Sequence, residues 1–307
     1  MTDLASTSHS LDPDLPWQPL PGGWSGETFL SRTGGEAHVV RIYAPERPRR
    51  PDAAEVDAAL SRLVGGLVPV PRVVEQRPAK DGHPALMVTE FVPGRRADDV
   101  LRAALDADDV ATLDSVGRAL GAVAGRLAGM PTLRRGRFSA PDLVVVADPA
   151  HGDVHARVTR RLGELRGWSE SELDALERVA ERAQDLLDEE PRTCLVHGDL
   201  NPKNVVLAGD GSVAAVVDWE YAHAGSPHED LGDLLRFDRH PAWEQAVLHG
   251  WTRERGGDPA LARDLARASD LAALVELTVR PGGNLVVDLA EVFLREIART
   301  GDWHAHP

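Results

Sequence analysis

The stretch LVHGDLNPKNVVL, Leu195–Leu207, places one histidine, one aspartate and two asparagines between two aliphatic runs. Aliphatic runs of this length favour buried strands, so the polar residues between them predict a loop held by two strands. Polar side chains that lose water in such a loop need hydrogen bonds or a ligand in return. The stretch therefore predicts a binding or catalytic loop on a sheet-like frame.

The residues that follow predict a hairpin. A second strand-like run, 213–218, comes after AGDGS, where Asp210-Gly211 is a typical turn pair. Pairing of the two strands, about 5 Å apart, would bring Asn204 and Asp218 side by side. Amide and carboxylate oxygens without cysteine or a histidine pair favour Mg²⁺ over zinc. Asp199 then stands outside the cation site and is free to accept a proton.

Outward from this loop, the chain divides into a sheet-rich and a helical part. Residues 1–16 are polar and contain prolines, which indicates a flexible tail. Residues 17–92 combine strand patterns with one helix, 52–64, for which Asp52 is the expected N-cap. Residues 93–307 are mostly helical by periodicity. The expected fold class is α+β with two lobes: a small N-terminal lobe with an antiparallel sheet, and a larger helical C-terminal lobe.

Composition narrows the function classes. The 34 bases and 49 acids of this 307-residue chain give a formal charge of −15, which argues against binding to nucleic acid or an anionic membrane and suits a cationic small molecule. No apolar run reaches the length of a bilayer span, and the first residues lack the pattern of a signal peptide. A single cysteine, Cys194, agrees with a cytoplasmic location and inert packing. We expect a monomer or simple homodimer.

HGDLNPKN followed at this distance by VDWE (217–220) resembles the catalytic loop and metal loop of the aminoglycoside phosphotransferase and choline kinase family. The resemblance covers nearly all of the chain after the tail. It implies a bilobal protein-kinase-like fold and an enzyme that moves the γ-phosphate of ATP or GTP to a small-molecule hydroxyl. Asp199 would be the catalytic base, and Asn204 and Asp218 would hold Mg²⁺.

The resemblance also implies a set of nucleotide-binding residues in and after the N-terminal sheet. A glycine-rich turn would cover the phosphates, a strand cation paired with a helix glutamate would bind them, and the link between lobes would read the adenine edge. The residues at these places are Gly22, Gly23, Ser25 and Gly26 of the turn, Arg41 with Glu55, and Glu90 to Val92. Arginine differs from the lysine usual at this position, because it can fork onto two oxygens. An ordinary solvent-facing arginine stays the alternative.

Three further residues of the motifs carry expected roles. His197 and Asp230 match positions that brace the catalytic loop, so we expect structural support from both. Lys203 is open to two interpretations: a contact with the γ-phosphate, or a solvated side chain. Protein kinases have their loop lysine where this chain has Asn201.

The sequence says least about which small molecule accepts the phosphate. The segment 136–157 and the C-terminal helices are expected to set specificity, and Glu220, Asp233 and Asp238 are candidate partners for ammonium groups, with helix-surface or capping charges as the alternative. The first expectation is an aminoglycoside-like or other amine-bearing antibiotic. Alternatives are a metabolite kinase acting on choline, thiamine or a sugar-like compound, a nucleotide-binding pseudokinase, and a metal-dependent hydrolase using His197, Asp199 and Asp218.

Overall fold

The computed structural model describes residues 17–20, 26–33, 35–43, 52–140, 142–148, 151, 153–280 and 284–307. The strands are β1 (Trp17–Pro19), β2 (Gly26–Thr33), β3 (Glu36–Tyr43), β4 (Val73–Arg77), β5 (Leu86–Glu90), β6 (Arg95–Arg96), β7 (Gly136–Ser139), β8 (Val144–Val146), β9 (Cys194–Val196), β10 (Val205–Leu207), β11 (Val213–Val216) and β12 (His223–Gly225). The helices are α1 (Ala53–Val64), α2 (Ala97–Asp106), α3 (Val110–Leu127), α4 (Val154–Arg161), α5 (Glu170–Asp188), α6 (Glu229–Leu235), α7 (Pro241–Arg255), α8 (Pro259–Thr278) and α9 (Leu285–Thr300), with short 3₁₀ turns η2 (Leu162–Glu164), η3 (Pro202–Asn204) and η4 (Trp219–Tyr221).

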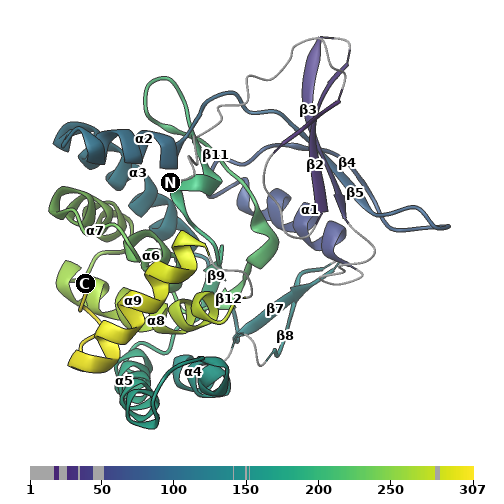
Figure 1. The fold of residues 1–307 in the computed structure, drawn as a ribbon. Coiled ribbons are helices and arrows are strands. Elements are labelled where there is room, and N and C mark those ends of the chain that lie inside the picture. Colours follow the sequence, from purple (N-terminus) through teal and green to yellow (C-terminus); the bar gives the residue numbers. More distant parts are fainter. Residues whose placement is uncertain are drawn as a thin grey trace.

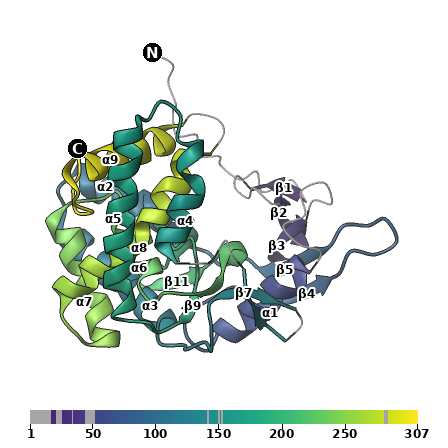
Figure 2. The ribbon, with the colours of Figure 1, turned by 90° about the horizontal axis from the view of Figure 1, so that it is seen from below.

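The N-terminal part is a five-stranded antiparallel sheet in the order β1-β2-β3-β5-β4, with α1 packed against it. Figures 1 and 2 show this sheet on one side of the molecule and most helices on the other. The expected fold class is confirmed: a sheet-rich N-terminal part precedes a helical C-terminal part. Arg41 lies on the central strand β3, opposite Thr28 of β2 and Met87 of β5. The domain boundary at 92/93 stays a prediction.

Helix α1 begins at the expected place, with Asp52 as its N-cap residue, but the Asp52 side chain is used elsewhere. Asp52 occupies the N-cap position, yet its side chain makes no capping hydrogen bond in the described part of the chain. Its Oδ2 instead accepts from Ser139 Oγ at 3.2 Å and from Ala140 N at 3.0 Å, at the end of β7. The carboxylate therefore joins the first helix to the segment 136–157.

The link between the two parts touches the predicted hairpin directly. After β5 the chain runs through Gly94 into β6, which pairs with β10. A Cβ at Gly94 would lie 2.4 Å from the carbonyl oxygen of Leu207, so only glycine allows this approach. The predicted hairpin is present, with Val205 of β10 opposite Val216 of β11 and Gly211 at φ +83° in the turn.

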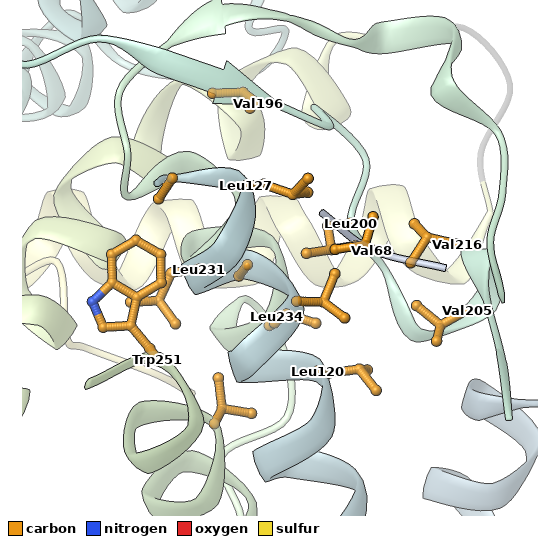
Figure 3. Packing of buried hydrophobic residues seen from close by; sticks show 14 of the residues in the cluster. Val68, Leu120, Leu127, Val196, Leu200, Val205, Val216, Leu231, Leu234 and Trp251 are labelled. Atoms are coloured by element: carbon orange, nitrogen blue, oxygen red, sulfur yellow. The ribbon is translucent and has the colours of Figure 1, made fainter. Parts of the chain in front are cut away.

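A large apolar core underlies the loop between β9 and β10. Leu200 of the loop is fully buried and belongs to the same cluster as side chains from α3, α6 and α7. Figure 3 shows residues of this cluster, among them Leu120, Leu127, Leu200, Val205 and Val216. Helices α3 and α7 cross in backbone contact, because a Cβ at Gly121 would lie 2.0 Å from Val247 O. The loop between β9 and β10 therefore packs, through Leu200, on the closely packed helices α3 and α7.

A second apolar cluster joins α4, α5, α8 and α9. No helix in the described ranges combines the length and apolarity needed to span a membrane.

Candidate active site

The Asp199 carboxylate is surrounded by donors from its own loop. Oδ2 accepts from the side-chain amide of Asn204 at 2.9 Å and lies 3.1 Å from Lys203 Nζ. Oδ1 accepts from the side-chain amide of Asn201. These donors fix the direction of the carboxylate. Lys203, about half exposed, therefore contacts Asp199 in this structure.

The hairpin sets Asp218 beside Asn204. Val217 N donates to the carbonyl oxygen of Asn204 at 2.9 Å, and Asp218 follows directly in a left-handed conformation with φ 66°. A left-handed non-glycine residue costs free energy, and aspartate is among the few residue types that tolerate it. The chain therefore bends at Asp218 directly after β11, and the Asp218 carboxylate contacts Arg41 of β3.

The donor chemistry of this pair fits a magnesium ion. The Asn204 amide nitrogen donates to both the carbonyl oxygen and Oδ2 of Asp199, which turns its Oδ1 the other way. Within the described residues, no hydrogen bond involves Asn204 Oδ1, and Asp218 Oδ2 likewise has no partner, since Arg41 contacts Oδ1. One amide oxygen and one carboxylate oxygen thus remain for a hard cation.

Arg41 of β3 joins two carboxylates of the hairpin region. Its Nη1 lies 2.8 Å from Asp218 Oδ1, and its Nη2 lies 2.5 Å from Glu220 Oε2. The side chains of Arg41 and Glu220 are 11% and 2% exposed, so this contact is nearly dry. Burial lowers the pKa of Arg41, but Asp218, Tyr43 and Glu220 together raise it above its ordinary value. The guanidinium is therefore a permanent cation at this site.

The expected ion pair between Arg41 and Glu55 is wrong. No contact between the two side chains exists in the described part of the chain, and Glu55 Oε2 is buried without a hydrogen-bond partner there. The spacing of Glu55 on its helix could not reveal this, because the competing carboxylates come from residues 177 and 179 positions away from Arg41.

His197 and Asp230 both contact the loop backbone. Asp230 accepts from His197 N at 2.9 Å and from Gly198 N at 3.0 Å. Burial raises the pKa of Asp230 to about 7, against the lowering effect of these two bonds. The His197 ring accepts from Asp199 N through Nδ1, so its Nε2 donates to Val217 O at 3.0 Å. Burial lowers the pKa of His197, which agrees with this neutral tautomer.

Two of the three carboxylates expected to face an ammonium group are occupied. Glu220 is buried against Arg41. Asp233 accepts from Leu200 N at 3.0 Å and pairs with Arg236, and burial raises the pKa of Asp233 to about 6. That expectation is therefore wrong for both. Asp238 is half-buried with a pKa raised by burial, and no hydrogen bond to it occurs among the described residues.

The nucleotide-side residues are placed only in part. Gly22, Gly23 and Ser25 lie outside the described residues, and Gly26 starts β2 opposite Tyr43. Glu90 N donates to Arg72 O at 3.0 Å and is therefore engaged in the sheet. Over the described ranges, no backbone hydrogen bond involves Val92, whose N–H and carbonyl remain available.

The segment 136–157 lies beside the loop through a buried histidine. Strand β7 pairs with β12, and β12 pairs with β9. His223 of β12 donates to Tyr221 O through Nδ1 and contacts Glu229 Oε2 at 3.1 Å, while the His151 ring lies 4.4 Å from its ring centre. A Cβ at Gly198 would lie 2.5 Å from Tyr221 O, so this layer sits directly against the loop.

Sequence reasoning missed two residues of the site. Asn201 was noted only as a replacement for a kinase lysine, yet it donates to the Asp199 carboxylate. Glu220 was read as a partner for ammonium groups, yet it holds Arg41. Its position two residues after Asp218 was the available signal, because a short turn places both side chains on one side.

A family model described as the phosphotransferase enzyme family matches residues 16–268. No curated protein sequence matches the chain.

Several solved structures share the fold. A thermostable mutant of aminoglycoside phosphotransferase APH(4)-Ia is 18% identical, with 93% of this chain and 94% of that chain covered and a TM-score of 0.62. Aminoglycoside 2'-phosphotransferase-IIIa, solved as a GDP complex, is 17% identical, with 94% and 95% covered and a TM-score of 0.60. Macrolide 2'-phosphotransferase type I is 15% identical, with 91% and 90% covered and a TM-score of 0.56.

Proposed function

The chain belongs to the phosphotransferase enzyme family, and on that premise we propose that it moves the γ-phosphate of a magnesium–nucleotide complex to a hydroxyl of an amine-bearing small molecule, with Asp199 as the catalytic base. The observation that carries the proposal is one hydrogen-bonded chain of groups. Asn204 donates to Asp199 at 2.9 Å, and its carbonyl accepts from Val217, the residue before Asp218. A base and two hard oxygen ligands therefore share one hairpin.

Asn204 Oδ1 and Asp218 Oδ2 are the proposed metal ligands, since both are left without protein partners in the described part of the chain. The chemistry that Mg²⁺ supplies in such a site is neutralisation of charge on the nucleotide phosphates. In this structure Arg41 contacts Asp218 at the other carboxylate oxygen, Oδ1.

Asp199 acts on the acceptor hydroxyl. Phosphoryl transfer has a loose transition state, so orientation of the hydroxyl and charge balance matter more than early proton removal. The bond from acceptor oxygen to phosphorus forms as the bond to the nucleoside diphosphate breaks, and the hydroxyl proton passes to Asp199. Asn201 and Asn204 hold the carboxylate during this step. Lys203, 3.1 Å from Asp199, adds positive charge on the γ-phosphate side.

The nucleotide contacts come from the N-terminal part. Arg41 offsets charge on the phosphates, and its fork suits two oxygens at once. The free N–H and carbonyl of Val92 suit the adenine edge, which presents one acceptor and one donor. Gly22 and Gly23, which precede β2 in the sequence, would let backbone approach the phosphates.

A cationic acceptor is supported by charge and by one carboxylate. The chain carries a formal charge of −15, and Asp238 is half-buried with no hydrogen-bond partner in the described ranges. An unpaired, partly desolvated carboxylate gains most from an ammonium group. The structurally similar proteins include aminoglycoside and macrolide phosphotransferases. We infer an aminoglycoside-like antibiotic as acceptor and resistance as the role, in the cytoplasm, where nucleoside triphosphates are supplied.

A metabolite kinase for choline or thiamine is the second candidate, because VDWEYA (217–222) is close to the form in the choline-kinase-like branch. The test is a coupled nucleotide-consumption screen over aminoglycosides, peptide antibiotics, macrolides, choline, thiamine and amino sugars, with Asp199→Asn as the inactive control. Turnover on an amine-bearing antibiotic supports the first candidate, and turnover on choline or thiamine alone supports the second. Binding of ATP with no turnover on any acceptor would instead favour a pseudokinase.

A further inference from the structure

We propose that Glu220, in place of Glu55 on helix α1, is the positioning residue for Arg41, so that the hairpin of the C-terminal part holds the phosphate-binding cation of the N-terminal sheet. The inference rests on the proposed function and adds to it the part of the chain that controls the nucleotide site.

The contact is short and dry. Arg41 Nη2 lies 2.5 Å from Glu220 Oε2, and the Glu220 side chain is only 2% exposed. A carboxylate removed from water needs a partner of this kind to offset its lost hydration, and the pair is screened little by salt. Glu220 is thereby too enclosed to meet an acceptor, and its side chain contacts Arg41.

The turn that carries Glu220 is itself fixed. Trp219 Nε1 donates to Val216 O at 3.1 Å, and the indole ring packs 4.5 Å from the ring centre of His197. His197 is in turn hydrogen-bonded to the loop that carries Asp199. A rigid path thus runs from the catalytic loop through η4 to Glu220, and then across to β3.

Helix α1 offers no equivalent hold. In protein kinases, a glutamate of this helix pairs with the strand cation and movement of the helix controls activity. Here α1 packs against η4, but Glu55 makes no contact with Arg41 among the described residues, and its Oε2 is buried without a hydrogen-bond partner there. In this protein the Arg41 side chain is therefore positioned by the hairpin residue Glu220 and not by helix α1.

The two carboxylates on Arg41 have different tasks in this scheme. Asp218 is a proposed metal ligand, so a bound Mg²⁺ would compete with Arg41 Nη1 for its carboxylate. Glu220 stays on Nη2 and keeps the guanidinium aimed, which leaves the Nη1 edge for a phosphate oxygen. Guanidinium geometry allows such a division, because its N–H groups point along separate edges.

The test compares Glu220→Gln with Glu55→Gln, two isosteric changes that remove one charge each. MgATP binding is measured by calorimetry, and KM for ATP and kcat are measured with an acceptor that wild type phosphorylates. We expect Glu220→Gln to weaken MgATP binding and raise KM on the order of tenfold with a smaller change in kcat, as for loss of a charged hydrogen-bond partner. Glu55→Gln should change both by less than about twofold. The reverse ranking would overturn the inference.

A double-mutant cycle separates positioning from a general structural effect. If Glu220 acts through Arg41, Glu220→Gln has little further effect on MgATP binding in an Arg41→Ala background, whereas additive losses would contradict this. Glu220→Asp, which keeps the charge, should recover part of the affinity and serves as the second variant if the glutamine variant melts early; no recovery speaks against the inference. Absence of MgATP binding by wild type overturns the proposed function itself, while normal wild-type binding with an unaffected Glu220→Gln overturns only the inference.

Discussion

The side-chain amide of Asn204 donates across 2.9 Å to the carboxylate of Asp199. The contact holds the base in one direction, and it turns the Asn204 amide oxygen away from the base. A proton acceptor and a cation site are thereby kept adjacent and separate.

Removal of the base should stop turnover and spare binding. Asp199→Asn keeps the size of the side chain but removes its charge, and positioned acid–base catalysis contributes roughly 10²–10⁴-fold. We expect kcat to fall by at least about 100-fold, while calorimetric affinity for MgATP changes little. Asp185→Asn on the exposed face of α5 is the matched control. Wild-type turnover in Asp199→Asn would contradict the role of the base.

Substitution of the proposed metal ligand Asp218 should weaken ATP binding only when Mg²⁺ is present. Asp218→Asn tolerates the left-handed backbone at φ 66° but removes one anion from the site. ATP affinity in the presence of Mg²⁺ should fall by about tenfold or more. In EDTA, affinity should be equal to or higher than that of wild type, because Arg41 loses a competitor for phosphate. Equal losses with and without Mg²⁺ would argue against a metal role.

Asp230 should matter for stability. Its carboxylate accepts from two backbone N–H groups of the loop, at 2.9 and 3.0 Å. Asp230→Ala leaves the buried His197 N–H and the part-buried Gly198 N–H without an acceptor. At ~1–3 kcal/mol per group this costs roughly 2–6 kcal/mol. Denaturant unfolding measures the loss, and Asp230→Asn, which keeps one acceptor, should lose less. An alanine variant as stable as wild type would show that the loop does not depend on this brace.

The crossing of α3 and α7 should reject a methyl group. A Cβ at Gly121 would lie 2.0 Å from Val247 O, so Gly121→Ala forces the helices apart. We expect a loss of about 1–3 kcal/mol or more in unfolding free energy, the range for overpacking. Gly163→Ala is the control, since nothing lies within 4 Å of its added Cβ. Similar stability of the two variants would contradict the tight crossing.

His223 should make stability depend on pH. Burial lowers its pKa, but Glu229 and the carbonyl of Tyr221 raise it above the ordinary value of 6.5. A histidine whose pKa is higher in the folded than in the unfolded state stabilises the fold. Its contribution is fully present at a pH below the unfolded-state pKa and is lost as the pH rises through the folded-state pKa. The melting temperature of wild type should therefore exceed that of His223→Gln by more at pH 6 than at pH 9. A gap that widens toward high pH would contradict this sign.

Local patterns predicted the frame of the protein well. The alternation in 36–43 gave a strand, and the turn pair Asp210-Gly211 gave the hairpin that sets Asn204 near Asp218. These features depend on residues that are close together in the sequence and on backbone geometry. A single amino-acid sequence is therefore enough to predict them.

Long-range pairing was not predictable in the same way. Arg41 pairs with Asp218 and Glu220, not with Glu55, because the N-terminal sheet contacts the hairpin of the C-terminal part. No local sequence pattern indicates this contact. Asp52 likewise contacts Ser139, 87 residues away. Asp233 was assigned to ammonium binding because its exposure was unknown, and burial beside Arg236 removes it from that role.

The most direct test is a crystal structure with a non-hydrolysable ATP analogue and Mn²⁺, whose anomalous signal locates the metal. We expect a metal peak within coordination distance of oxygens of Asn204 and Asp218, with the γ-phosphate facing Asp199. A metal bound by other residues, or a γ-phosphate on the far side of Asp218 from Asp199, would contradict it.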